Sequence, residues 1–157
     1  MPTGVSLADL LARETREVEA FVELLREEQK LLAASGNADA LLRIAERKSQ
    51  FAVQLRAIAD QRERHLASRG YGSGRSGMEA CLAAPESAGL RDPWQRLLAA
   101  AKEAHVLNET NGKLIAVHWQ HNQKALAALM SAADGAMVYG PDGQQTGSGG
   151  RRFLSSA

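Results

Sequence analysis

Three histidines are the residues of this 157-residue chain that most directly suggest metal chemistry. His105, His118 and His121 offer imidazole ligands, but a di-iron helical bundle needs Glu-x-x-His pairs facing inward on two helices. No glutamate in the chain is followed by histidine three residues later. We therefore expect surface or interface histidines, with no metal and no cofactor.

Nucleotide binding and nucleophilic catalysis have weak support in the sequence. Gly72, Gly74 and Gly77 match G-x-G-x-x-G, but that fingerprint has meaning only between a strand and a helix, and a charged helical segment precedes it here. Cys81 is the single cysteine, which excludes an internal disulfide. The chain has no G-x-S-x-G nucleophile motif. We expect a glycine-rich loop and no enzyme activity.

The composition predicts an all-α protein. Helix-forming residues dominate, and aromatic residues make up only 4% of the chain. The net charge of +1 gives no reason to expect a nucleic acid partner. Because the first residues lack the apolar core of a signal peptide and no apolar run reaches membrane-spanning length, we expect a cytoplasmic protein.

Two long helices are predicted in the first half of the chain. Ser6 with Asp9 is typical of an N-terminal cap, so the first helix should run from there to about Ala34. Gly36 and Asn37 indicate a tight turn into an antiparallel helix over 38–68. The first helix has a heptad seam in which glutamates occupy two of the apolar positions, and these are Glu14 and Glu28.

A third, longer helix is predicted from Asp92 and Pro93, which suit an N-cap and a first helical turn, to about Ala133. We expect an elongated antiparallel three-helix bundle over 1–134 and an irregular, flexible partner-binding segment over 135–157. Counted from Trp94, four-three spacing predicts a packing seam on this helix. Its members include the poor helix formers Asn108, Gly112 and Asn122, together with Ile115, and Asn111 lies alongside.

The asparagines of this packing seam have two interpretations. In the first, they select register within the bundle, and Gly112 lets two helices approach closely. In the second, the polar seam and the apolar end beyond it receive a helix from another protein. That apolar end, 125–130, extends past the length that the first two helices can cover, and exposed apolar stripes of this kind are typical of binding surfaces.

Three motifs follow one another in the second half of the chain. "LNETNGKL" reads as L-N-x-x-N-G-x-L, "HNQKAL" follows it, and "VYGPDGQ" at 138–144 precedes a "GGRR" tail. Their order and spacing resemble those of the FlgN family of flagellar type III export chaperones. The resemblance implies a chaperone without enzymatic activity that binds the C-terminal helical region of hook-associated proteins from the hook-filament junction. It also implies that the chaperone prevents their premature assembly and brings them to the export gate. We expect neither a nucleic acid partner nor a small-molecule substrate.

The resemblance also places the site toward the C-terminal end of the chain. It suggests apolar contacts with the substrate protein at Leu126, Leu129, Met130, Met137 and Val138. It suggests contact with the export gate at Tyr139, for which a turn-anchoring role is the alternative. The glycine-rich insertion over 71–89 departs from the family pattern. The competing hypothesis for the whole chain is a structural coiled-coil protein that self-associates through the third helix.

Overall fold

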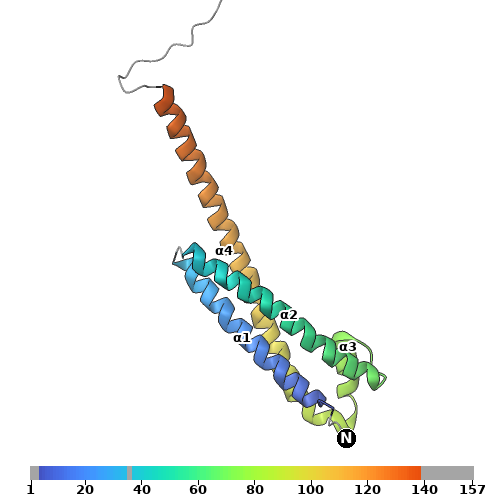
Figure 1. Cartoon of the computed structure of the whole chain (residues 1–157). Coiled ribbons are helices and arrows are strands. Elements are labelled where there is room, and N and C mark those ends of the chain that lie inside the picture. Colours follow the sequence, from blue (N-terminus) through green and yellow to red (C-terminus); the bar gives the residue numbers. More distant parts are fainter. Residues whose placement is uncertain (1–3, 35–36, 139–157) are drawn as a thin grey trace, which may run out of the picture. The chain divides into compact units, whose positions relative to one another are not determined.

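The structure, a computed structural model, describes residues 4–34 and 37–138, and these are helical apart from short turns. The elements are α1 (Leu7–Ala33), α2 (Ala38–Ser68), α3 (Gly74–Leu82), the 3₁₀ helix η1 (Pro85–Leu90) and α4 (Arg91–Val138) (Figure 1). The prediction of an all-α helical bundle is confirmed.

The chain divides into two compact units, Met1–Ile115 and Ala116–Ala157. The first holds α1, α2, α3, η1 and the beginning of α4, and the second holds the rest of α4. The boundary expected between 134 and 135 falls inside α4, which continues to Val138. The expected flexible segment lies almost wholly outside the described residues and stays a prediction.

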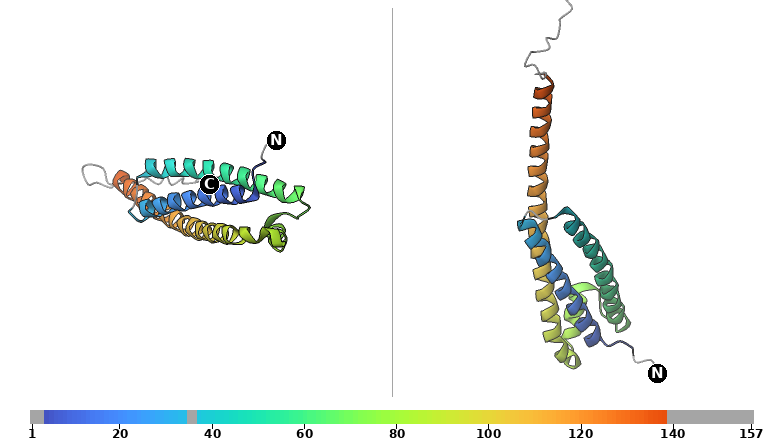
Figure 2. Two further views of the ribbon diagram at one scale, coloured as in Figure 1. Left: turned by 90° about the horizontal axis from the view of Figure 1, so that it is seen from below. Right: turned by 60° about the vertical axis from the view of Figure 1, so that its left-hand side comes forward.

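The helices α1 and α2 begin at the N-terminal caps that the sequence predicted. Ser6 and Asp9 form a reciprocal capping box at the start of α1. The Asn37 side chain accepts hydrogen bonds from the N–H groups of Asp39 and Ala40 at the start of α2. Such caps satisfy backbone donors that have no partner within the helix. The two helices then lie antiparallel and side by side (Figure 2).

The first part of α4 packs parallel to α1. Ion pairs join Glu19 to Arg96 and Arg26 to Glu103, so both helices advance by seven residues between the two contacts. The core between the helices is apolar. Its buried members are Leu7, Leu11, Val18, Val22 and Leu25 of α1, Leu66 of α2, Met78, Cys81 and Leu82 of α3, and Trp94, Leu97 and Ala104 of α4.

The insertion between α2 and α4 differs from expectation in its details. Part of the expected glycine-rich loop is helical, because α3 begins at Gly74, and α4 begins directly after η1 rather than from an Asp92 cap. The glycines of the G-x-G-x-x-G match have steric roles. Gly74 has a φ of +67°, and a Cβ on Gly77 would lie 1.8 Å from the carbonyl oxygen of Gly72.

One buried and one partly buried ion pair explain the glutamates in the α1 seam. Arg62 Nε donates to Glu14 Oε2 at 2.8 Å, and Lys48 Nζ donates to the Glu28 carboxylate at 3.1 and 3.2 Å. Glu14 and Glu28 are two heptads apart in α1, as Lys48 and Arg62 are in α2. Only one antiparallel register forms both pairs, and any other leaves a buried charge without its partner, which is costly.

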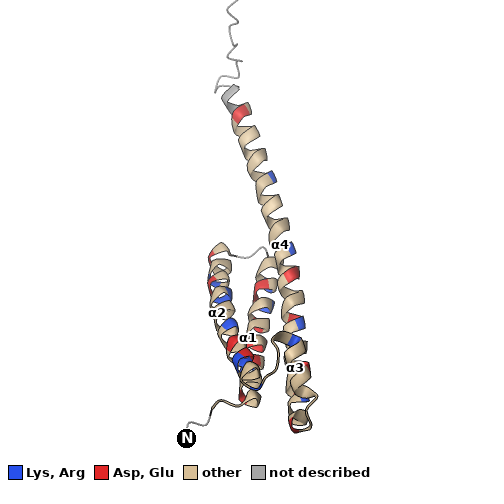
Figure 3. Cartoon of the chain, turned by 90° about the vertical axis from the view of Figure 1, so that its right-hand side faces the viewer, with Lys and Arg blue, Asp and Glu red and all other residues tan. Residues whose placement is uncertain are grey.

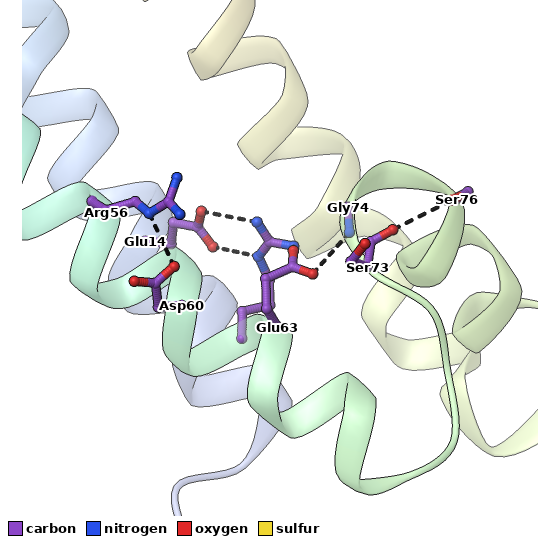
Figure 4. A network of polar contacts seen from close by, with 8 residues as sticks. Glu14, Arg56, Asp60, Glu63, Ser73, Gly74 and Ser76 are labelled. Atoms are coloured by element: carbon purple, nitrogen blue, oxygen red, sulfur yellow. Dashed lines mark hydrogen bonds and ion pairs between the residues drawn. The ribbon is translucent and has the colours of Figure 1, made fainter.

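Arg62 also connects α2 to the insertion. Its second contact is with Glu63, at 3.0 Å, and Glu63 in turn accepts the backbone N–H of Gly74 at 2.8 Å (Figure 4). The guanidinium lies 5.4 Å from the centroid of the Trp94 ring, a distance suited to a cation–π interaction. The same side chain thus contacts α1 and α4 directly and is linked to the start of α3 through Glu63.

We predict that Arg62→Leu lowers the free energy of unfolding by about 3–5 kcal/mol, because it leaves the Glu14 carboxylate buried and unpaired. Urea titration followed by circular dichroism measures the change. Arg56, which forms an exposed pair with Asp60, supplies the control, and Arg56→Leu should change the value by no more than about 0.5 kcal/mol. The double variant Glu14→Leu, Arg62→Leu should recover much of the loss. A double variant as unstable as Arg62→Leu would contradict the unpaired-charge explanation.

Candidate functional site

The face of α4 that packs in the first unit is offset by one residue from the predicted packing seam. The buried positions are Trp94, Leu97, Ala104 and Asn111, and the last three are seven residues apart. The predicted seam ran through Leu98 and its heptad equivalents. Because residues 97 and 98 are both leucine, either register gives an apolar seam. In the structure Leu97 is the buried one, packed against α1.

The register offset corrects the expected roles of three residues. Asn108, Gly112 and Ile115 are exposed, so they do not face α1 or α2. A Cβ on Gly112 would meet nothing within 4 Å, so this glycine permits no close helix approach among the residues that the structure describes. Packing of these residues against another protein stays a prediction.

Of the residues between 108 and 122 predicted at or beside the packing seam of α4, only Asn111 is buried. Its side chain is fully buried, and Nδ2 donates to the carbonyl oxygen of Leu25 and to Glu28 Oε2, each at 2.8 Å. Because Glu28 also accepts from Lys48, one carboxylate joins α1, α2 and α4. The sequence indicated a polar seam position at Glu28 but not its two partners.

The second unit carries an exposed apolar surface. Four of its large side chains are more than half exposed, with values of 63% for Trp119, 59% for Leu126, 69% for Leu129 and 61% for Met130. We call these four residues and Asn122, which is also exposed, the α4 stripe. Residues 119, 122, 126 and 129 alternate spacings of three and four, so they follow one side of the helix.

Very little charge accompanies the α4 stripe. Between residues 116 and 135 the charged side chains are Lys124 and Asp134, and Figure 3 shows this part of α4 as almost uniformly uncharged. Lys124 is two residues before Leu126, about 160° away around the helix. An apolar stripe of this length is a candidate protein-binding surface.

The structure describes only some of the side chains predicted to contact the substrate protein. Leu126, Leu129 and Met130 are exposed on one side of α4, as expected. Met137 and Val138 belong to α4, but their side chains are outside what the structure describes, as is all of Tyr139. Asn122, predicted to lie in a packing seam, is exposed between Trp119 and Leu126.

Other candidate chemistry lacks an organised site in the described part of the chain. No cluster of three metal-ligating side chains occurs among residues 4–34 and 37–138, and no described helix is long and apolar enough to cross a membrane. Two open grooves lie between α1 and α4, and both are lined by Glu19 and Arg96. These two side chains form an ion pair with an N–O distance of 2.8 Å.

We predict that Asn111→Ala lowers the free energy of unfolding by about 1–3 kcal/mol, because it removes two buried hydrogen bonds, one of them to a charged group. The matched variant Asn108→Ala alters an exposed asparagine of the same helix and should cost less than about 0.5 kcal/mol. Thermal or urea unfolding of both variants tests the register. The reverse order of effects would show that α4 packs through Asn108 instead.

Comparison with known proteins places these features in a family. The family described as "FlgN protein" matches residues 1–147. The "Flagella synthesis protein FlgN" of Yersinia enterocolitica is 41% identical over 58 residues, which are 37% of this chain and 39% of that protein. The protein of the same name from serotype O:8 matches to the same extent. The matched segment therefore spans well under half of these relatives, and no solved structure matches the chain.

Proposed function

This chain belongs to the FlgN family, and we propose that it is a flagellar export chaperone for hook-associated proteins of the hook-filament junction. In this proposal it acts in the cytoplasm without enzymatic activity. It binds the C-terminal helical region of its substrate protein, prevents premature assembly and delivers the substrate to the type III export gate.

The exposed α4 stripe is the observation that carries this proposal. A substrate that later polymerises through an amphipathic helix needs the apolar side of that helix covered until export. An apolar helical surface with few charges does this reversibly by helix-to-helix packing. The stripe has suitable dimensions, because Trp119 to Met130 spans about three helical turns, and its large side chains are more than half exposed.

The contact surface extends in our proposal from Leu126, Leu129 and Met130 to Met137 and Val138. All five belong to α4. Residues 130 and 137 are one heptad apart, so the same side of the helix is continued. Tyr139, the next residue, makes the contact with the export gate. Substrate binding and gate binding would then be adjacent in sequence but carried by different residues.

We predict that the double variant Leu126→Asp, Leu129→Asp weakens binding of a hook-associated protein at least about tenfold, because two carboxylates would be buried against apolar side chains. Isothermal titration with the purified substrate measures the loss. Helical circular dichroism and the unfolding midpoint should stay unchanged, since both leucines are exposed in the free chain.

The control for this double variant places the same two charges elsewhere on α4. Val117 and Gln120 are exposed, and they lie away from Leu126 around the helix. Val117→Asp, Gln120→Asp should therefore bind the substrate like the wild-type chain. Equal loss in both double variants would indicate a general effect of charge, and equal retention would place the binding site outside the α4 stripe.

We predict that Tyr139→Ala separates capture from delivery. The variant should bind a hook-associated protein with unchanged affinity, because the residue lies beyond the proposed apolar contacts, while secretion of that protein into the medium falls. Tyr139→Phe tests whether the hydroxyl is needed or only the ring. Loss of substrate affinity in Tyr139→Ala would contradict the assignment to the export gate.

The heptad spacing of the α4 stripe also favours a second candidate, a structural protein that self-associates permanently through α4. Sedimentation velocity separates the two functions. A chaperone exchanges any self-contact for its substrate, so the substrate complex should form at the expense of an oligomer. An oligomer that persists with saturating substrate and depends on Leu126 and Leu129 would favour the structural function.

A further inference from the structure

Asn122 is the polar member of an otherwise apolar stripe. It is exposed, and it lies between Trp119 and Leu126 in the three-four spacing of a helix-packing seam. Among the described residues its side-chain amide has no hydrogen-bond partner. A helix that covers the stripe would bury this amide, so the chemistry of that helix at the facing position matters.

Asn111 shows how this chain accommodates an asparagine at a helix-to-helix contact. Eleven residues before Asn122 in α4, its amide is fully buried and donates to the backbone carbonyl of Leu25 and to the Glu28 carboxylate. The facing helix thus supplies acceptors within an apolar surface. Without such acceptors the buried amide would lose its bonds to water and gain nothing in return.

We propose that Asn122 is a specificity-determining residue that selects an amphipathic partner helix carrying one amide side chain within its apolar stripe. The proposal rests on the export-chaperone function above and concerns the same site. An asparagine or glutamine on the partner both donates to and accepts from the Asn122 amide. Pairing of the two amides then fixes which layers of the two helices face each other.

The composition around Asn122 leaves amide side chains, not charges, as the main source of polar selection. Lys124 is the single charged residue between 116 and 133, and it points away from Leu126 around the helix. Ion pairs therefore contribute little to choosing a register or a partner. Apolar contacts alone discriminate poorly, because leucines in neighbouring heptads are interchangeable, whereas an unpaired buried amide penalises every incorrect layer.

The test uses the full chain and two designed four-heptad peptides as probes. Both carry leucine at the seam positions, and they differ at one central seam position, which is asparagine in the first peptide and leucine in the second. Dissociation constants are measured for each peptide with the wild-type chain and with Asn122→Leu. Comparing the ratio of the two constants between the two proteins cancels differences in peptide helicity and self-association, because both proteins meet the same two peptides.

We expect the wild-type chain to shift this ratio toward the asparagine peptide by at least about tenfold relative to Asn122→Leu, the factor that one unpaired buried amide implies. Because Asn122 is exposed in the free chain, the substitution should leave the unfolding midpoint unchanged. The matched control Gln120→Leu replaces another exposed amide outside the α4 stripe and should give the wild-type ratio.

Three outcomes would overturn the proposal: equal ratios for wild type and Asn122→Leu, an equal shift in Gln120→Leu, or binding of neither peptide by the wild-type chain. A parallel titration with a hook-associated protein separates this inference from the chaperone function. Substrate bound through Leu126 and Leu129 with no peptide discrimination rejects only the role of Asn122. Substrate bound by none of the proteins rejects the chaperone function itself.

Discussion

The Glu28 carboxylate is the contact on which the arrangement of the long helices depends. It belongs to α1, accepts from Lys48 of α2 and accepts from Asn111 of α4. A buried carboxylate is strongly unfavourable unless partners satisfy it, so the two other helices must present their donors at the same level. Glu14 and Arg62 impose a second such condition two heptads away. Together these contacts define the alignment, while apolar burial supplies most of the driving force.

The sequence predicted the helix starts, which depend on neighbouring residues, but not the packing register of α4, which depends on contacts between distant residues. Caps at Ser6 and Asn37 gave correct helix starts because a cap is chemistry between residues two or three apart. The predicted register of α4 was wrong because a first step from Trp94 of three residues to Leu97 fits an apolar seam as well as the step of four to Leu98. Choosing between them requires knowing that Asn111 meets Glu28, a contact across 83 residues. Even so, the exposure of Leu126 and Leu129 was predictable from helix length alone.

The asparagines of α4 therefore occupy three different environments. Asn111 is buried and bonded to α1, Asn108 is exposed beside the bundle, and Asn122 is exposed within an apolar stripe. Each costs some helix propensity relative to alanine. For Asn111 the buried hydrogen bonds offset that cost. For Asn122 nothing in the described residues does, which directs attention to a partner that would.

The helical state of the α4 stripe bears on how it would bind. A helix with asparagine, histidine and tryptophan is marginal in isolation, because the first turn is costly to nucleate. Here α4 is already nucleated where Trp94, Leu97 and Ala104 are buried, and further residues extend an existing helix. A preformed helix loses less conformational entropy when a partner binds than a segment that must fold at that moment. Part of the ordering cost is thus met during folding of the bundle, so a few exposed apolar side chains can suffice for reversible capture.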